Sequence, residues 1–247
     1  MLFRYRGVAG LYRERIRPQA GNLQWLALGE YELPSGAAMG PSCWPDHEAL
    51  LFLWRGEAVV RLADREFPLA HYDALYVPCG AAFELCNPGD ETTRIWAARA
   101  PAEKAHPAFH ARFEDVRCQE ARIRRLKGKT VYLMFDVSEA ADRLVAGYTF
   151  FEPFARSWPP HNHSDQEEIY VFLRGRGSME VYDKPESLTF VHNVREGDAV
   201  SIPRWNYHPV FSQDSPLEFV WVIAGARYWV GDKNRDFMSG TAQSVTA

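Results

Sequence analysis

Short apolar runs separated by turn residues fill most of the chain. Apolar and polar side chains alternate within several runs, and such alternation is typical of β-strands. In the first half we expect strands at residues 22–33, 48–56, 57–63, 74–78, 81–86 and 92–100. In the second half we expect strands at residues 129–136, 146–153, 167–175, 178–183, 188–194, 199–203, 206–212 and 217–225. A short helix is expected at 138–142, where Ser138 can cap it. Short strands at this spacing are typical of sandwiches and barrels, so the pattern predicts an all-β protein.

The two halves of the chain repeat one pattern. Residues 49–56 (ALLFLWRG) align with 168–175 (EIYVFLRG), and residues 73–85 align with 198–210. In both halves a glycine ends the first segment and a proline lies inside the second. Residues 101–118 follow a looser pattern with two prolines, so they are the expected linker. We therefore expect two copies of one β unit, in domains 1–110 and 111–247.

Composition and charge narrow the possible functions. The 247 residues are 47% hydrophobic and 24% charged, with a net charge of −4, as expected for a soluble globular protein. This charge does not favour a nucleic-acid partner, and no lysine-rich block indicates a membrane surface. The N-terminus lacks the apolar run of a signal peptide, and no stretch of about 18 apolar residues predicts a membrane span. The cysteines, Cys43, Cys79, Cys86 and Cys118, are scattered, which favours a reduced, cytoplasmic protein.

Two histidines one residue apart, His161 and His163, stand out in the segment PPHNHSDQEE. Residues i and i+2 of an extended chain point to the same side, so both imidazoles can bind one metal ion. A carboxylate follows at Glu167 or Glu168. In an unbroken strand Glu167 would share the histidines' face, but residues 164–166 are typical of a turn, which resets the alternation. Glu168 is therefore the expected ligand, with Glu167 as the alternative.

A further histidine, His208, lies in the segment GDAVSIPRWNYHPV, which begins at Gly197. Together the two segments resemble the signature of the cupin family. The first cupin motif is HxH, three or four residues, Glu, six residues and Gly, and it matches from His161 to Gly175. The second is Gly, five residues, Pro, any residue, Gly, two residues and His, and here Trp205 replaces the second glycine. The resemblance implies one metal site made of His161, His163, Glu168 and His208.

The cupin resemblance also implies a bicupin, with two tandem jelly-roll barrels. The first half lacks the ligands, because the repeat puts Ala49 in the place of the glutamate and Phe83 in the place of the last histidine. Ser42 and Trp44 fall roughly where the paired histidines would be. We therefore expect one divalent ion per chain, in the second domain. Zn²⁺ is the first choice, and Mn, Fe or Ni are the alternatives, since all accept imidazole together with carboxylate.

The segments GYTFFEP, SWPPHNH, PRWNYHPV and VIAGARYWVGDKNRDF are similar to the second domain of the 5-deoxy-glucuronate isomerase family of myo-inositol catabolism. A related isomerase family, which acts on 5-dehydro-4-deoxy-D-glucuronate in pectin breakdown, carries a tryptophan at the position of Trp205. The resemblance implies an intramolecular oxidoreductase that interconverts the aldose and ketose forms of a deoxy sugar acid. 5-Deoxy-glucuronate is the first choice of substrate, and a homo-oligomer is expected.

The catalytic groups are expected near the ligands. Glu167 adjoins the ligand set and is the expected general base. Arg204 is the expected partner of the substrate carboxylate, because a guanidinium suits a carboxylate, with Arg156 and Arg174 as alternatives. Tyr170 is one aromatic candidate for the wall of a sugar pocket. Plain polar or surface roles are expected for His106, His110, His192, Lys127 and Lys129.

Two other functions fit the same residues. An iron-dependent cupin dioxygenase would use the same ligand set, and it would consume oxygen. A non-catalytic cupin would bind a sugar without turning it over.

Overall fold

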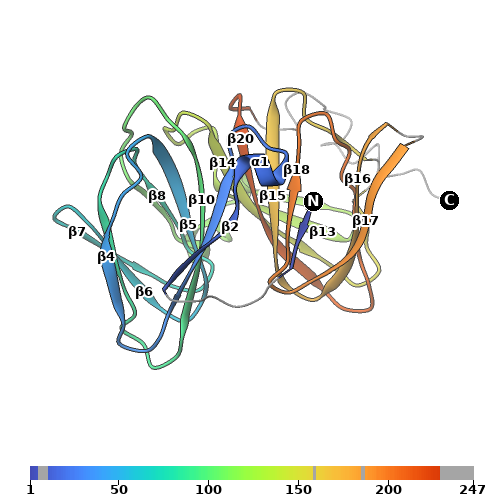
Figure 1. The fold of residues 1–247 in the computed structure, drawn as a ribbon. Helices are drawn as coiled ribbons and strands as arrows, with labels where there is room; N and C mark the ends of the chain where they lie inside the picture. The colour runs from blue at the N-terminus through green and yellow to red at the C-terminus, as the bar shows by residue number, and fades with distance from the viewer. Residues whose placement is uncertain (5–10, 158–159, 185–186, 229–247) are drawn as a thin grey trace.

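The structure is a computed structural model that describes residues 1–4, 11–157, 160–184 and 187–228. It contains two β-barrels side by side (Figure 1), the first made by the N-terminal half and the second by the C-terminal half. Short helices accompany the strands: α1 (Pro18–Gly21), α2 (Phe113–Val116) and the 3₁₀ helix η1 (Glu120–Arg122). In the described part of the chain, no helix has both the length and the apolar character needed to cross a membrane.

The first barrel has a six-stranded sheet, in the order β11-β8-β5-β10-β3-β2, and a four-stranded sheet, in the order β4-β9-β6-β7. Its strands are β2 (Tyr12–Ile16), β3 (Ala27–Leu33), β4 (Ala38–Ser42), β5 (His47–Arg55), β6 (Ala58–Leu62), β7 (Arg65–Leu69), β8 (Ala74–Val77), β9 (Phe83–Cys86), β10 (Thr93–Pro101) and β11 (Phe109–Ala111).

The second barrel has a seven-stranded sheet, in the order β1-β18-β15-β20-β14-β13-β12, and a three-stranded sheet, in the order β17-β16-β19. Its strands are β1 (Leu2–Phe3), β12 (Ile123–Leu126), β13 (Lys129–Phe135), β14 (Leu144–Phe151), β15 (Gln166–Arg174), β16 (Arg176–Lys184), β17 (Ser187–Arg195), β18 (Ala199–Ile202), β19 (Val210–Ser212) and β20 (Leu217–Gly225).

The strand register confirms the internal repeat. Ala49 of β5 pairs with Val77 of β8, and the equivalent Glu168 of β15 pairs with Ile202 of β18. The repeated Gly175, which ends β15, has a φ of +86°, which side-chain-bearing residues rarely adopt. A Cβ atom on Gly175 would also lie 2.0 Å from the carbonyl oxygen of Pro216. The turn after β15 therefore requires glycine, as the repeated sequence pattern indicates.

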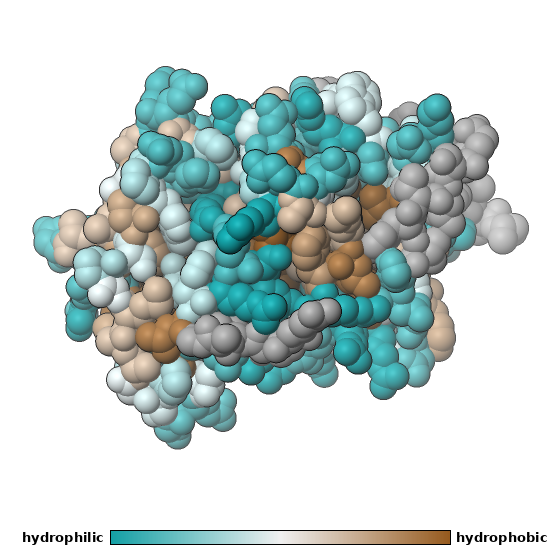
Figure 2. Space-filling model, viewed as in Figure 1, coloured by the Kyte–Doolittle hydropathy of each residue, from teal (hydrophilic) through white to brown (hydrophobic). Residues whose placement is uncertain are grey.

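The large sheets of the two barrels pack against each other. Strands β5 and β15 are almost wholly buried because one face lines the barrel interior and the other meets the opposite barrel. On β15, Tyr170 and Phe172 point into the second barrel, while Ile169 and Val171 join a core shared with the first. Burial on both faces explains why these strands are nearly continuous apolar runs. Figure 2 shows that polar residues cover much of the viewed surface, with small apolar patches between them.

The domain limits are less clean than the repeat suggests. The expected boundary after residue 110 falls inside β11, which pairs with β8 of the first barrel. The expected linker at 101–118 is packed, since Ala111 and Val116 are buried in the shared core. Residues Leu2–Phe3 pair with β18 and so extend the second barrel's sheet. We propose that the first domain ends after β11. We also propose that Leu2–Phe3, near the start of the chain, belong to the second domain.

The helix expected at 138–142 is wrong. Residues 137–139 form turns and a bend instead. In a helix the N–H of Asp142 would bond to the carbonyl of Ser138, but it donates to the buried carboxylate of Glu48, at 2.9 Å. The N–H groups of Arg143 and Leu144 donate to the same carboxylate. A contact distant in sequence therefore determines the conformation of this segment.

Candidate metal centre

The two ligand segments are hydrogen-bonded to each other. The N–H of Trp205 donates to the carbonyl of His163, at 2.7 Å, and the Nδ2 of Asn162 donates to the carbonyl of Trp205, at 3.2 Å. Trp205, which stands at the second glycine of the cupin motif, has a φ of +68°, a left-handed conformation that glycine adopts most easily. The expected strand at 206–212 is shortened to Val210–Ser212, and the preceding loop carries His208.

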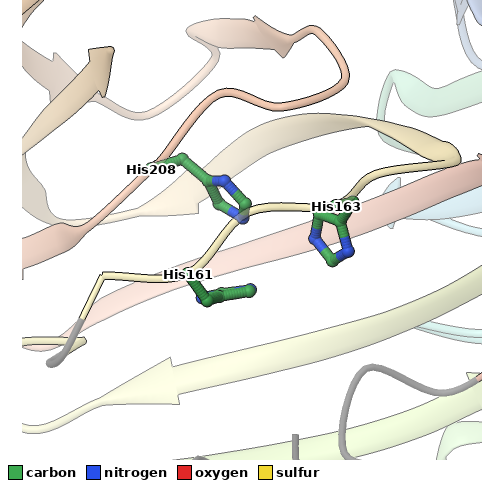
Figure 3. A group of neighbouring side chains, drawn as sticks. All are labelled: His161, His163 and His208. Atoms are coloured by element: carbon green, nitrogen blue, oxygen red, sulfur yellow. The ribbon is translucent and has the colours of Figure 1, made fainter. Parts of the chain in front are cut away.

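The three imidazoles converge, as Figure 3 shows. Ligand atoms of His161, His163 and His208 all lie within 4.8 Å of one another. Glu168 joins them from β15, with its Oε2 atom 3.3 Å from Nε2 of His163 and 3.1 Å from Nε2 of His208. The Nδ1 of His208 lies 2.9 Å from the carbonyl of Asn206. A carbonyl can only accept, so Nδ1 carries the proton and Nε2 presents its lone pair to the cluster.

The donor atoms fit a metal ion. His163, Glu168 and His208 are each at most 4% exposed. In the described part of the chain, Nε2 of both histidines and Oε2 of Glu168 have no hydrogen-bond partner. Buried polar atoms normally have hydrogen-bond partners, and three that converge without one form a donor set that fits a metal cation.

The charge states of the cluster also suit a metal ion. Burial lowers the pKa of His161 well below its usual value, and nearby His208, His163 and Lys129 lower it further, so the imidazole is neutral. Burial raises the pKa of Glu168, but the adjacent His163 and His208 outweigh it and hold that pKa below its usual value. Glu168 is therefore ionised. Neutral imidazoles and a carboxylate are the forms that bind divalent metals.

Glu167 points away from this cluster. Its carboxylate, 2% exposed, accepts backbone N–H groups of Gln24, Trp25 and Leu26 at 2.6–2.7 Å. Strand alternation sends it to the opposite face of β15 from Glu168. These hydrogen bonds do not favour the expected role of general base, and the geometry favours Glu168 over Glu167 as the ligand.

The three candidate arginines do not line the cavity beside the cluster. Arg204 is exposed, with its guanidinium 5.3 Å from the centre of the Trp25 ring. Arg174 is exposed and lies 3.5 Å from Glu218, and Arg156 is exposed as well. The described residues that line the cavity include no arginine, so the cavity lining does not support the substrate-binding role expected for Arg204.

The cavity beside the cluster encloses about 80 Å³, several times the space that one water molecule needs. Its walls include His161, His163, Glu168 and Tyr170, together with the apolar side chains of Leu126, Val131, Val145, Phe151, Val210, Phe219, Trp221 and Ile223. Tyr170 is therefore a wall residue, as expected. Burial raises its pKa well above the usual value, and Glu168 adds to this, so its hydroxyl keeps the proton.

Lys129 also lines the cavity, so the expectation of a surface position is wrong. The residue is 7% exposed, and its Nζ donates to Oγ of Ser157, at 3.1 Å. Burial lowers the pKa of Lys129 to about 8. The sequence contains a pattern that predicts a buried Lys129. Lys129, Val131 and Leu133 are spaced two residues apart, so they share one face of β13, and Val131 and Leu133 pack in the barrel core.

The other histidines of the expectation have structural partners. His106 lies 2.7 Å from Asp142, and His110 lies 2.9 Å from Asp73. His192 is exposed on β17.

Hydrocarbon fills the equivalent place in the first barrel. Phe83, at the position of His208, is 1% exposed, and its ring centre lies 5.1 Å from that of Trp44 and 6.3 Å from that of Tyr31. Ala49, at the position of Glu168, is fully buried. Among the described residues, one group of three or more His, Cys, Asp or Glu side chains is suited to hold a metal ion, and it consists of His161, His163 and His208.

These observations define a two-barrel cupin with a histidine cluster in its second barrel. The chain belongs to the KduI/IolB family, whose sequence model matches residues 10–238.

Known relatives agree with this assignment. A 4-deoxy-L-threo-5-hexosulose-uronate ketol-isomerase of Opitutus terrae is 28% identical over 180 residues, which are 67% of this chain and 62% of that relative. The match thus spans less than two thirds of the relative's length. An IolB-like protein of Salmonella typhimurium has a TM-score of 0.75 at 20% identity, over 90% of this chain and 95% of that one. A deletion mutant of Bacillus subtilis oxalate decarboxylase has a TM-score of 0.69 at 15% identity, over 91% and 80%. Both of these solved structures share the fold of this chain.

Proposed function

We propose that the protein is a metal-dependent isomerase that interconverts the aldose and ketose forms of a deoxy sugar acid. One observation carries the proposal: in the described part of the chain, buried donor atoms of His163, Glu168 and His208 converge without hydrogen-bond partners, beside a cavity that His163 and Glu168 line. His161 completes the proposed ligand set. Membership of the KduI/IolB family supports the reaction class.

The proposed chemistry needs a polarised carbonyl. A divalent cation, when bound, stabilises the negative oxygen that develops as the proton next to a carbonyl leaves. The ionised Glu168 and the imidazoles of His161, His163 and His208 would hold it. Tyr170 keeps its proton and offers an O–H donor inside the cavity. The mainly apolar walls lower the local dielectric constant and so strengthen electrostatic interactions with the reacting atoms.

Two sugar acids are candidate substrates. The name of the Opitutus terrae relative gives 4-deoxy-L-threo-5-hexosulose uronate, which is another name for 5-dehydro-4-deoxy-D-glucuronate. The resemblance of the segments around His161 and His208 adds 5-deoxy-glucuronate, with a place in myo-inositol catabolism. Both compounds carry a carbonyl at one end and a carboxylate at the other. Zn²⁺ remains the first choice of metal, and assembly into a homo-oligomer remains a prediction.

The test is an NMR assay of the purified protein with each uronate in turn, in buffer with and without added Zn²⁺. We expect signals of the ketose form to grow with one substrate, and a chelator to abolish this turnover. No turnover of either uronate, with or without Zn²⁺, Mn²⁺, Fe²⁺ or Ni²⁺, would contradict the proposal.

The same samples separate the rival functions. An oxygen electrode would detect a dioxygenase by oxygen consumption that depends on iron. Binding of a uronate without any product would indicate a sugar-binding cupin.

A further inference from the structure

A buried lysine shares the cavity with the metal centre. Lys129 lies at the start of β13, and its ammonium is 5.6 Å from the centre of the Phe151 ring. Among the described residues that line the cavity, Lys129 is the only ammonium, and Glu168 is the only carboxylate. Burying an ammonium among apolar side chains costs several kcal/mol. A charge kept at that cost, inside the proposed active site, indicates a function.

Lys129 and Glu168 enter the cavity from different rows of its strands. Lys129 pairs with Phe151 at the end of β14, whereas Glu168 lies in the row of Ile223 and Val145 near the start of β14. The ammonium-bearing residue and the ligand Glu168 therefore have separate places in the wall of one cavity.

Hydrogen bonds connect the lysine to one of the ligand segments. The Oγ of Ser157 accepts from Lys129, and the N–H of Ser157 donates to the carbonyl of Val210, at 2.8 Å. Ser157 lies four residues before His161, and Val210 lies two residues after His208. These hydrogen bonds thus connect the ammonium to the segment that carries His208.

We propose that Lys129 binds the carboxylate of the sugar acid while the carbonyl end lies at the metal centre, and that Lys129 thereby selects acids over neutral sugars. This inference rests on the proposed function and names the group that recognises its substrate class. A substrate carboxylate would form a charge-assisted hydrogen bond with the buried ammonium. A neutral sugar offers only an uncharged acceptor, so it would bind more weakly.

The test compares three variants of the metal-loaded protein. Lys129→Met removes the charge at similar volume, Lys129→Arg keeps it, and Lys127→Met is the matched control because Lys127 is exposed two residues away. Calorimetry measures the affinity for D-glucuronate, a stable uronate probe, and for D-glucose, its neutral counterpart. Metal content and Tm are measured on every sample.

We expect Lys129→Met to weaken D-glucuronate binding about 100-fold, as for loss of one partner in a buried charge pair. Its metal content should be unchanged, and its Tm should equal or exceed that of the wild type. Lys129→Arg should recover part of the affinity, and Lys127→Met should bind as the wild type does. For a turned-over uronate, the loss should be mainly in KM rather than in kcat.

Equal binding of D-glucuronate by the wild type and by Lys129→Met would overturn the inference, and so would a wild type that binds D-glucose as well as D-glucuronate. The proposed function can fail separately. If D-glucuronate binding depends on Lys129 but neither deoxy uronate is turned over, the carboxylate site stands and the isomerase activity does not.

Discussion

Glu167 and Glu168 are adjacent on β15, but their side chains have different surroundings. Strand alternation directs Glu168 toward three imidazoles and Glu167 toward the backbone of the first barrel. Both are buried carboxylates, but only Glu168 has an oxygen that lacks a hydrogen-bond partner in the described part of the chain. Their different surroundings predict different effects of the same substitution.

We expect Glu168→Gln to weaken metal binding by more than about 100-fold, since losing even an outer partner of a metal ligand costs about 10–100-fold. For the wild type, a metal concentration of about 100 times Kd should add about 2.7 kcal/mol to the free energy of unfolding. Thermal unfolding with and without Zn²⁺ measures this gain. Glu84→Gln, on an exposed side chain of the first barrel, is the control and should keep the full gain. A full gain in Glu168→Gln would argue against Glu168 as a ligand.

The sequence predicts the cluster better than the substrate site. The HxH spacing and the glycine–proline pattern identify His161, His163 and His208 because metal ligands need a fixed residue type at a fixed spacing. Arg204 is near the ligands in sequence, yet its guanidinium stacks on Trp25 instead of facing the cavity. Lys129 is distant in sequence and reaches the cavity because β13 lies in the same curved sheet as β15. Proximity in sequence is a poor guide to such contacts, since they depend on sheet order.

At the scale of elements, the glycine that ends β15 fixes the connection to β16. Gly175 combines a positive φ with close packing against Pro216. Gly36 has a similar φ of +70°, but a Cβ atom on it would meet no other described atom within 4 Å. A comparison of Gly36 with Gly175 therefore separates the cost of a left-handed backbone from the cost of steric overlap.

We expect Gly36→Ala to cost about 1–2 kcal/mol in the free energy of unfolding, from the left-handed conformation alone. Gly175→Ala should cost about 4 kcal/mol or more, because the methyl group also overlaps a carbonyl oxygen. Chemical denaturation of both variants measures the difference. Equal losses would show that the backbone around Gly175 relaxes freely.

For the whole molecule, two buried glutamates join the barrels reciprocally. Glu48 of the first barrel accepts the N–H groups of Asp142, Arg143 and Leu144, which lead into β14. Its repeat equivalent, Glu167 of the second barrel, accepts the N–H groups of residues 24–26, which lead into β3. The repeat in the sequence predicts equivalent positions, but it does not reveal that each carboxylate binds the other half.

We expect Glu48→Gln and Glu167→Gln each to lower the free energy of unfolding by about 3 kcal/mol, because each loses hydrogen bonds to a charged acceptor. Metal content should stay at the wild-type level in both variants. Denaturation and metal analysis on the same samples check this. If Glu167→Gln instead kept full stability and lost turnover, Glu167 would be a catalytic base after all.

We propose that the second barrel binds one metal ion through four side chains. Metal binding can be measured by elemental analysis of the purified chain after dialysis against Zn²⁺ and removal of the excess. We expect about one equivalent of metal per chain in the wild type, and almost none in a His208→Ala variant that remains folded. A wild type that retains no Zn²⁺, and none of Mn²⁺, Fe²⁺ or Ni²⁺ in the same experiment, would show that this barrel has no metal site.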